Sequence, residues 1–126
     1  MDTAALVAFY NFDDEKHLRS TELFREIGDN NMGTLIISDY IFDETINLLK
    51  RYLGNRKTTA IGDYLLKEIE LKRIELPVFL LSWELSKKFD KLSFTDCSNI
   101  ALMKHYNIDY LATFDSGFDG IVKVLR

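Results

Sequence analysis

The sequence predicts an α/β fold in which helices cover both faces of a mostly parallel sheet. Short β-rich runs alternate with amphipathic segments along the chain, which is the pattern of βαβ units. Pro77 is the only proline, and no repeat or low-complexity tract marks a linker. A chain of 126 residues is long enough for one domain with its own hydrophobic core. We therefore expect residues 1–126 to form a single α/β domain.

The first elements follow from the spacing of apolar residues. Residues 15–30 carry apolar side chains at helical spacing and end in a Gly-Asp-Asn-Asn turn, which predicts an amphipathic helix. The short apolar run over 34–38 predicts a buried strand. A helix over 40–54 is expected to end at Gly54, because glycine readily adopts the conformation that terminates helices.

The later elements continue the alternation of helix and strand. The expected order is a helix over 58–72, a strand over 73–78, helices over 79–89 and 93–106, and strands over 109–114 and 121–126. In such parallel sheets, ligand sites lie beyond the carboxyl ends of the strands. Residues that follow a strand directly are therefore the first to consider for chemistry.

Charge and composition limit the class of protein. The formal net charge is −4, which disfavours nucleic-acid binding by bulk positive charge but leaves two local basic runs, at 50–57 and 86–91. No apolar run approaches the ~18 residues that a membrane span needs. The N-terminal residues contain no basic leader, and the single cysteine, Cys97, excludes an internal disulfide. We expect a cytoplasmic protein in which Cys97 contributes to packing.

Asp96 is the first residue that such a fold does not explain. At ~100° of rotation per helical residue, it lies between Ile100 and Met103 on the apolar stripe of its helix. The structural alternative is a capping box, with Ser93 as the N-cap and Asp96 three residues further on. Capping does not require the acid to share a face with apolar residues, so both interpretations stay open.

Glu44 shows the same feature on another helix. It borders the apolar arc within ~40° of Leu48, whereas its neighbour Asp43 points to the far side of the helix. A glutamate at the edge of the core that extends outward is common, so Glu44 alone does not establish a site.

Two further acids are candidates by position. Asp115 directly follows the expected strand 109–114, at the edge where a site is expected, although an Asx-turn before Gly117 would also explain it. Asp119 lies further from the strand end and is a weaker candidate. Asp2, close to the N-terminus, indicates nothing by itself.

Taken together, these acids predict a cation site. Carboxylates that converge repel one another unless they are protonated or neutralised by a cation. Ligand sets made only of oxygen suit Mg²⁺ or Mn²⁺, and the two histidines form no metal-spaced pair. No Ser-His-Asp arrangement, P-loop, GxGxxG or CxxC is present. The pattern favours metal-activated water that attacks a phosphodiester.

The order of these motifs resembles the PIN-domain ribonucleases, especially the small prokaryotic VapC-type toxins of toxin–antitoxin pairs. "MDTAALVAFYNFDDEKH" is similar to the opening segment of the family, with Asp2 in the first acidic position. "LIISDYIFDETINLLKR" is similar to the second motif, with Glu44 in the acidic position. "KLSFTDCSNIALMKHYNIDYLATFDSGFDGI" resembles the third and fourth motifs, with Asp96 and Asp115.

The resemblance implies a three-layer α/β/α sandwich in which these four acids hold one or two Mg²⁺ or Mn²⁺ ions. It implies hydrolysis of RNA to products with a 5′-phosphate, a homodimer, and inhibition by a cognate antitoxin protein. Thr3 and Thr113, next to the first and fourth acids, are expected to assist by hydrogen bonding.

One departure from the family concerns the first strand. Family members have a short hydrophobic strand before the first aspartate, in the middle of the sheet, whereas here only Met1 precedes Asp2. Either the sequence starts late or the strand is truncated to residues 1–4. A missing central strand would expose backbone edges and apolar surface on both neighbouring strands.

Two other functions compete with the ribonuclease. One is a non-catalytic module of the same fold that binds RNA or a partner protein and forms no metal-dependent product. The other is a phospho-acceptor receiver domain, which predicts an acidic pair in one strand–loop; no such pair lies near a clear strand here.

Overall fold

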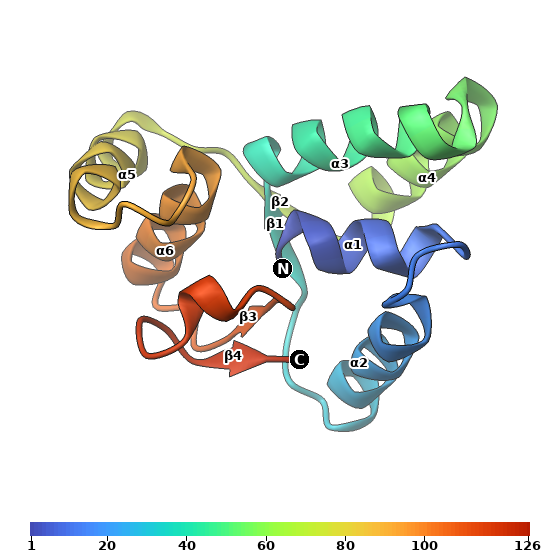
Figure 1. The fold of residues 1–126 in the computed structure, drawn as a ribbon, viewed down its shortest axis with the longest axis horizontal. Helices are drawn as coiled ribbons and strands as arrows, with labels where there is room; N and C mark the ends of the chain where they lie inside the picture. Colours follow the sequence, from blue (N-terminus) through green and yellow to red (C-terminus); the bar gives the residue numbers. More distant parts are fainter.

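The computed structural model describes all 126 residues and has the α/β architecture that the sequence predicts. Figure 1 shows its elements in chain order. They are α1 (Thr3–Tyr10), α2 (His17–Asp29), β1 (Ile36–Ser38), α3 (Asp39–Leu53), α4 (Asn55–Glu68), β2 (Glu70–Lys72), α5 (Leu76–Lys88), α6 (Phe94–Tyr106), β3 (Leu111–Ala112), the 3₁₀ helix η1 (Ser116–Phe118) and β4 (Val124–Leu125).

The strands form two parallel pairs between two layers of helices. β1 pairs with β2, with Ile37 opposite Leu71, and β3 pairs with β4, with Leu111 opposite Val124. The helices α5 and α6 lie on one side of the strands and α1 to α4 lie on the other (Figure 1). This is the predicted α/β/α sandwich with parallel strands, and none of its helices is long and apolar enough to cross a membrane.

Of the two alternatives for the first strand, a strand over residues 1–4 does not form, because α1 begins at Thr3. Met1 and Asp2 lie between the two strand pairs, and Asp2 has an extended backbone. The Met1 amino group donates to the Ile36 carbonyl at 2.9 Å, and the Asp2 N–H donates to the Ala112 carbonyl at 2.9 Å. Since α1 is apolar on nearly all sides and largely buried, it lacks the amphipathic period by which surface helices are predicted.

The expected strand over 73–78 is also wrong. The strand β2 lies earlier, over Glu70–Lys72, and α5 begins at Leu76 with Pro77 in its first turn. Proline is favoured there because its fixed φ suits a helix start, where the missing N–H has no helical partner to lose. The helix before β2, α4, ends at Glu68, whereas the sequence pattern placed its end at residue 72.

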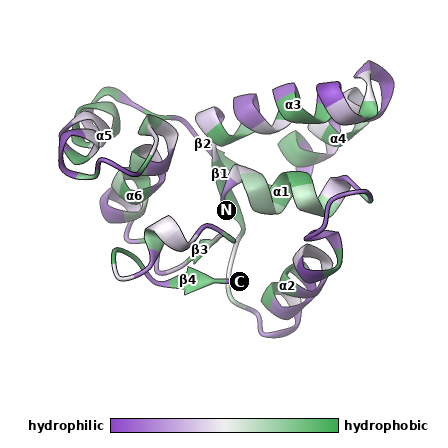
Figure 2. Cartoon of the chain, viewed as in Figure 1, coloured by the Kyte–Doolittle hydropathy of each residue, from purple (hydrophilic) through white to green (hydrophobic).

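Two hydrophobic clusters hold the layers together. One contains Ile100 of α6, Leu111 of β3 and Phe118 of η1, and the other contains Leu6 of α1 and Ile41 of α3. Figure 2 shows α1 as mostly hydrophobic, whereas α3 and α4 alternate between hydrophobic and hydrophilic positions. The clusters fix the N-terminus of α1, the first turns of α3 and α6, and the end of β3 relative to one another.

The buried N-terminus gives the fold a pH-dependent stability. Burial lowers the pKa of the Met1 amino group to about 6 from 8.0, against the opposing effect of the Asp2 charge. Between these pH values the unfolded chain binds a proton that the folded chain does not, so the free energy of unfolding rises with pH across this window. A difference of this size corresponds to about 2–3 kcal/mol.

Urea unfolding at pH 6, 7 and 8 measures this rise. An N-terminally acetylated chain lacks the titrating group and should show a smaller rise over the same range. Equal pH dependence in the two proteins would contradict the assignment to Met1.

Candidate active site

Asp2 lies at the centre of the site, at the N-terminus of α1. It is the N-cap of that helix, and its Oδ1 accepts from the Thr3 N–H at 2.8 Å. Its Oδ2 accepts from the Thr113 hydroxyl at 2.9 Å. Asp2 is 6% exposed and Thr113 is fully buried. The carboxylate is thus fixed from two sides, by its own helix and by the residue that follows β3.

Two threonines connect Asp2 with other predicted acids. The Thr3 hydroxyl donates to Glu44 Oε2 on α3 at 2.8 Å. The Thr113 hydroxyl, which donates to Asp2, also accepts from the Asp115 N–H at 3.0 Å. Thr3 and Thr113 thus form hydrogen bonds to predicted acids, as expected, whereas a part in catalysis stays a prediction. Three segments that are far apart in the chain therefore meet through these two hydroxyl groups.

Asp96 lies in the first turn of α6 and forms the capping box that the sequence offered as its structural explanation. The Ser93 N–H donates to Asp96 Oδ2 at 2.8 Å, and the Asp96 N–H donates to the Ser93 hydroxyl at 3.1 Å. The side chain is half-buried. The cap uses one carboxylate oxygen, so Oδ1 is free for another role.

Asp115 likewise forms a local bond. Its Oδ1 accepts from the Gly117 N–H at 2.7 Å, at the start of η1, which is the turn that the sequence offered as an alternative. The residue is exposed, and no hydrogen bond uses its Oδ2. Asp119 instead pairs with Arg126, and this charged partner lowers the pKa of the Asp119 carboxyl.

The electrostatics of the site favour a cation. Burial raises the pKa of the Asp2 carboxyl, the Thr113 hydrogen bond lowers it, and the negative charge of Asp96 raises it further. Asp96 is thus close enough to Asp2 for its charge to act there. The six ion pairs of the protein include none of the four predicted acids. Carboxylates in this arrangement are relieved either by protonation or by a positive ion.

The oxygen ligands of the four acids suit a hard divalent ion, but their side chains lie farther apart than the ligands of a formed metal site. All four acids offer oxygen ligands, as Mg²⁺ and Mn²⁺ prefer. No three acidic, histidine or cysteine side chains lie close enough together to share one ion. The capping bond of Asp96 and the turn bond of Asp115 explain part of this spread, because each directs one oxygen to its own backbone.

Asn99 is a polar residue of this region that the sequence patterns missed. It lies one turn after Asp96 on the buried face of α6, is 5% exposed, and its Nδ2 has no hydrogen-bond partner. The sequence signal that could have identified Asn99 is an amide on an otherwise apolar face of the helix. Cys97 beside it is fully buried, which confirms its predicted packing role.

Comparisons with known proteins agree with this architecture. A model of the PIN domain family matches residues 1–124. The crystal structure of Mycobacterium tuberculosis VapC20, described as a sarcin–ricin loop cleaving toxin, has a similar fold, with a TM-score of 0.82 and 23% sequence identity over 95% of this chain and 92% of that chain. The search of curated proteins gave no match. Because the family model extends over nearly all residues, the resemblance seen in the motifs is confirmed, and the chain belongs to the PIN-domain family with the fold of a VapC-type toxin.

Proposed function

We propose that the protein is a metal-dependent ribonuclease whose ion, Mg²⁺ or Mn²⁺, is held by Asp2, Glu44, Asp96 and Asp115. The observation that carries the proposal is that Thr3 and Thr113 connect Asp2 to Glu44 and to the backbone of Asp115, while the charge of Asp96 acts on Asp2. No basic side chain pairs with any of the four acids. Membership of the PIN family and the fold shared with an RNA-cleaving toxin support RNA as the substrate. We also propose that residues 1–126 act as one domain.

In this mechanism the side chains hold and orient, and none of them acts as a nucleophile. Asp2 is fixed by the Thr3 backbone and the Thr113 hydroxyl, so its carboxylate orientation is set before any ligand arrives. Thr3 likewise orients Glu44. When bound, the ion supplies Lewis-acid activation of water and neutralises charge on the scissile phosphate. The protein contributes two oriented carboxylates, Asp2 and Glu44, and Asp115 is exposed to solvent beside them.

The proposal is tested by RNA cleavage as a function of added Mg²⁺ and Mn²⁺. We expect no cleavage after treatment with EDTA, recovery on addition of either ion, and products with a 5′-phosphate. Specific RNA or protein binding with no metal-dependent product would instead establish the non-catalytic module. That alternative has some support, since the side chains as placed form no closed metal site.

We further propose that the protein is the toxin of a toxin–antitoxin pair in the cytoplasm, and that it acts as a homodimer. The support for protein partners is an exposed apolar face on α5, which carries Leu76, Phe79, Leu80 and Trp83. Exposed apolar patches of this kind mark protein interfaces more often than free surface. A dimer and a bound antitoxin would each bury such a face.

RNA affinity should depend on the basic turn between α3 and α4, over residues 50–57. Its four lysines and arginines are exposed and form no ion pair. We expect the double variant Arg51→Gln/Arg56→Gln to bind RNA more weakly and to reduce the slope of log affinity against log salt by about 1.4, from ~0.7 per phosphate contact. The control is Arg25→Gln/Lys104→Gln, which removes two exposed charges elsewhere.

Both variants are measured by RNA titration in EDTA at several salt concentrations, so that no cleavage occurs. An equal change in slope for the two would show that the turn contributes only to the overall charge.

A further inference from the structure

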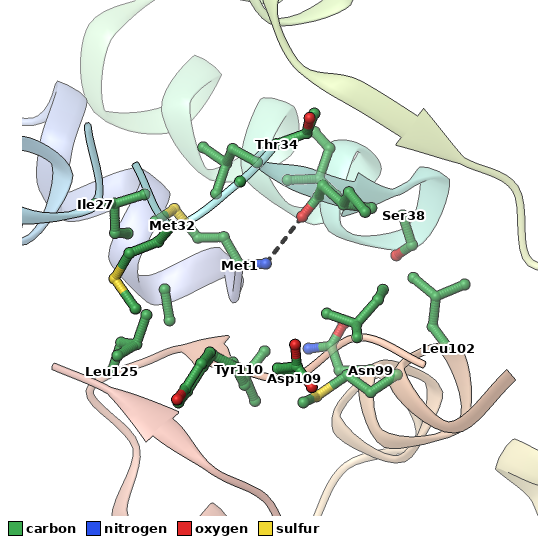
Figure 3. A pocket seen from close by; sticks show the side chains of 18 residues that line it. Met1, Ile27, Met32, Thr34, Ser38, Asn99, Leu102, Asp109, Tyr110 and Leu125 are labelled. Carbon is green, nitrogen blue, oxygen red and sulfur yellow. Dashed lines mark hydrogen bonds between the residues drawn. The ribbon is translucent and has the colours of Figure 1, made fainter. Parts of the chain in front are cut away.

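Two cavities adjoin the residues on either side of Asp2 and Thr3. Met1 lines one of them, an apolar slot of about 190 Å³ in which 13 of the 18 lining residues are hydrophobic (Figure 3). Ala4 lines the other, a cavity of about 560 Å³ in which only 4 of the 9 lining residues are hydrophobic. Sites for small ligands commonly have ~300–1,000 Å³. The second cavity, called the polar cavity below, therefore has both the size and the lining to recognise a polar ligand group.

The polar cavity follows the groove between α1 and α3, which lie side by side (Figure 1). At one end is Ala4, whose neighbour Thr3 bonds to Glu44. At the other end is Tyr52, eight positions after Glu44 on α3 and therefore about 12 Å further along the helix. Stacked nucleotides rise ~3.4 Å each, so an RNA strand covers this distance with about three or four of them. RNA that contacts both the acids and the basic turn over residues 50–57 would cross this cavity.

Tyr52 presents a free aromatic ring at the cavity. The residue is 56% exposed, and none of the aromatic pairs or cation–π contacts of the protein includes it. Exposed rings beside basic residues are the surfaces on which proteins stack the bases of single-stranded RNA. Stacking alone tolerates any base, so a preference would come from the polar groups of the lining.

The loop between α1 and α2 supplies hydrogen-bond acceptors to the same cavity. Asp14 shapes this loop, since its Oδ1 accepts from the Lys16 N–H at 2.8 Å. Asp13 and Glu15 are exposed, and neither carboxylate accepts a hydrogen bond or forms an ion pair. A carboxylate can accept from two parallel N–H donors. Guanine is the RNA base with two neighbouring N–H donors, N1 and N2, on its Watson–Crick edge.

Two cations flank the cavity and suit the phosphates of the same strand. The Nζ of Lys16 lies 5.8 Å from the centre of the Phe114 ring, next to Asp115. Arg51 precedes Tyr52 in the basic turn. Neither Lys16 nor Arg51 forms an ion pair. Phosphate contacts with these side chains would offset the repulsion between the strand and the loop carboxylates.

We propose that the polar cavity binds one unpaired guanine of the RNA, stacked on Tyr52 and hydrogen-bonded along its Watson–Crick edge by the carboxylates of Asp13 and Glu15. This inference rests on the proposed ribonuclease and names the base that positions the strand over the acids. An arginine side chain of a protein partner has similar donors and also stacks on tyrosine. Guanine is favoured because the cavity lies between the acids and the basic turn, where the RNA passes.

The test is titration with an oligouridine that carries a single central guanosine, and with versions that carry adenosine or inosine there. EDTA is present throughout. We expect the guanosine version to bind at least about fivefold more tightly than either of the others, because inosine lacks the N2 donor and adenosine lacks the pair. Tyr52→Leu should weaken this binding at least about fivefold, whereas Tyr52→Phe should retain it. The control is Tyr64→Leu on α4, which removes a ring of equal exposure, 56%, and should change nothing.

Asp13→Asn/Glu15→Gln separates recognition of the base from the effect of charge. It removes two negative charges, so all three oligonucleotides should bind somewhat more tightly, but the preference for guanosine should be lost. Asp63→Asn/Glu75→Gln removes two other exposed acids and should keep the preference.

Equal binding of the three oligonucleotides, or an equal effect of Tyr52→Leu and Tyr64→Leu, would overturn the proposal. Tighter binding of the peptide acetyl-Gly-Arg-Gly-amide than of the guanosine oligonucleotide would assign the cavity to a protein partner and would overturn it as well. Because the titrations contain no metal ion, they are independent of cleavage. A protein that prefers guanosine and cleaves no RNA would refute only the ribonuclease, and one that cleaves RNA without this preference would refute only the guanine site.

Discussion

Asp96→Asn should abolish metal-dependent RNA cleavage while leaving the protein folded. Asparagine keeps the size of the side chain and an oxygen that can accept from the Ser93 N–H, so the start of α6 should be retained. It removes the negative charge that acts on Asp2 and offers a weaker ligand for a hard cation. We expect a loss of at least about 100-fold in cleavage rate, from the size of effects seen at metal sites. The measurement is single-turnover cleavage in Mg²⁺ or Mn²⁺, with circular dichroism as the check on folding.

Ser93→Ala is the matched control, because it removes the cap and leaves the carboxylate. Loss of the Ser93 hydroxyl should lower the free energy of unfolding by about 1 kcal/mol. Cleavage below the melting temperature should stay close to that of the unmodified protein. If Asp96→Asn cleaves at the full rate, or if Ser93→Ala loses activity to the same degree, Asp96 has a structural role only.

Phe118→Ala should have the largest effect on stability. Phe118 is fully buried in the cluster that joins α6 and β3, and it follows the turn that carries Asp115. Truncation of a buried phenylalanine leaves a cavity and costs about 3–5 kcal/mol. The free energy of unfolding, from urea titration, measures this loss. The loop with Asp115 should also lose order, so cleavage should fall even where the protein remains folded.

Phe12→Ala is the corresponding exposed substitution. Phe12 is 82% exposed in the turn after α1, so its removal should change the free energy of unfolding by no more than about 0.5 kcal/mol. A loss below about 1 kcal/mol for Phe118→Ala would mean that η1 does not anchor the loop as the structure shows.

The amphipathic helices were predictable because one face of each lies against the core. The expected helices over 40–54 and 93–106 agree closely with α3 and α6. Gly54 follows the end of α3 and Asn107 follows the end of α6, each with a positive φ that ends the helix. α1 was missed because burial on nearly all sides removes the polar face that gives a helix its period. The strand over 73–78 was misplaced because apolar residues around Pro77 satisfy strand and helix patterns equally over so short a run.

The site was predictable in its residue types and only partly in its geometry. Asp96 was conspicuous because an acid interrupts an apolar stripe, and Asp115 because it follows a strand. Both also form the local bonds that the alternatives described, since capping and ligation use different oxygens of one carboxylate. The link from Glu44 to Asp2 through Thr3 depends on contacts between α1 and α3 and could not be read from spacing. Asn99 was missed because its significance lies in a hydrogen bond that is absent.

Titration of Mn²⁺ into the RNA-free protein, followed by calorimetry, tests most directly whether the four acids form a cation site. We expect saturable binding of one or two ions, strongly weakened in Asp96→Asn and in Asp2→Asn, and unchanged in Asp43→Asn, whose side chain is exposed on the outer face of α3. Absence of saturable binding, or equal binding by all four proteins, would contradict a shared cation site and with it the proposed ribonuclease mechanism.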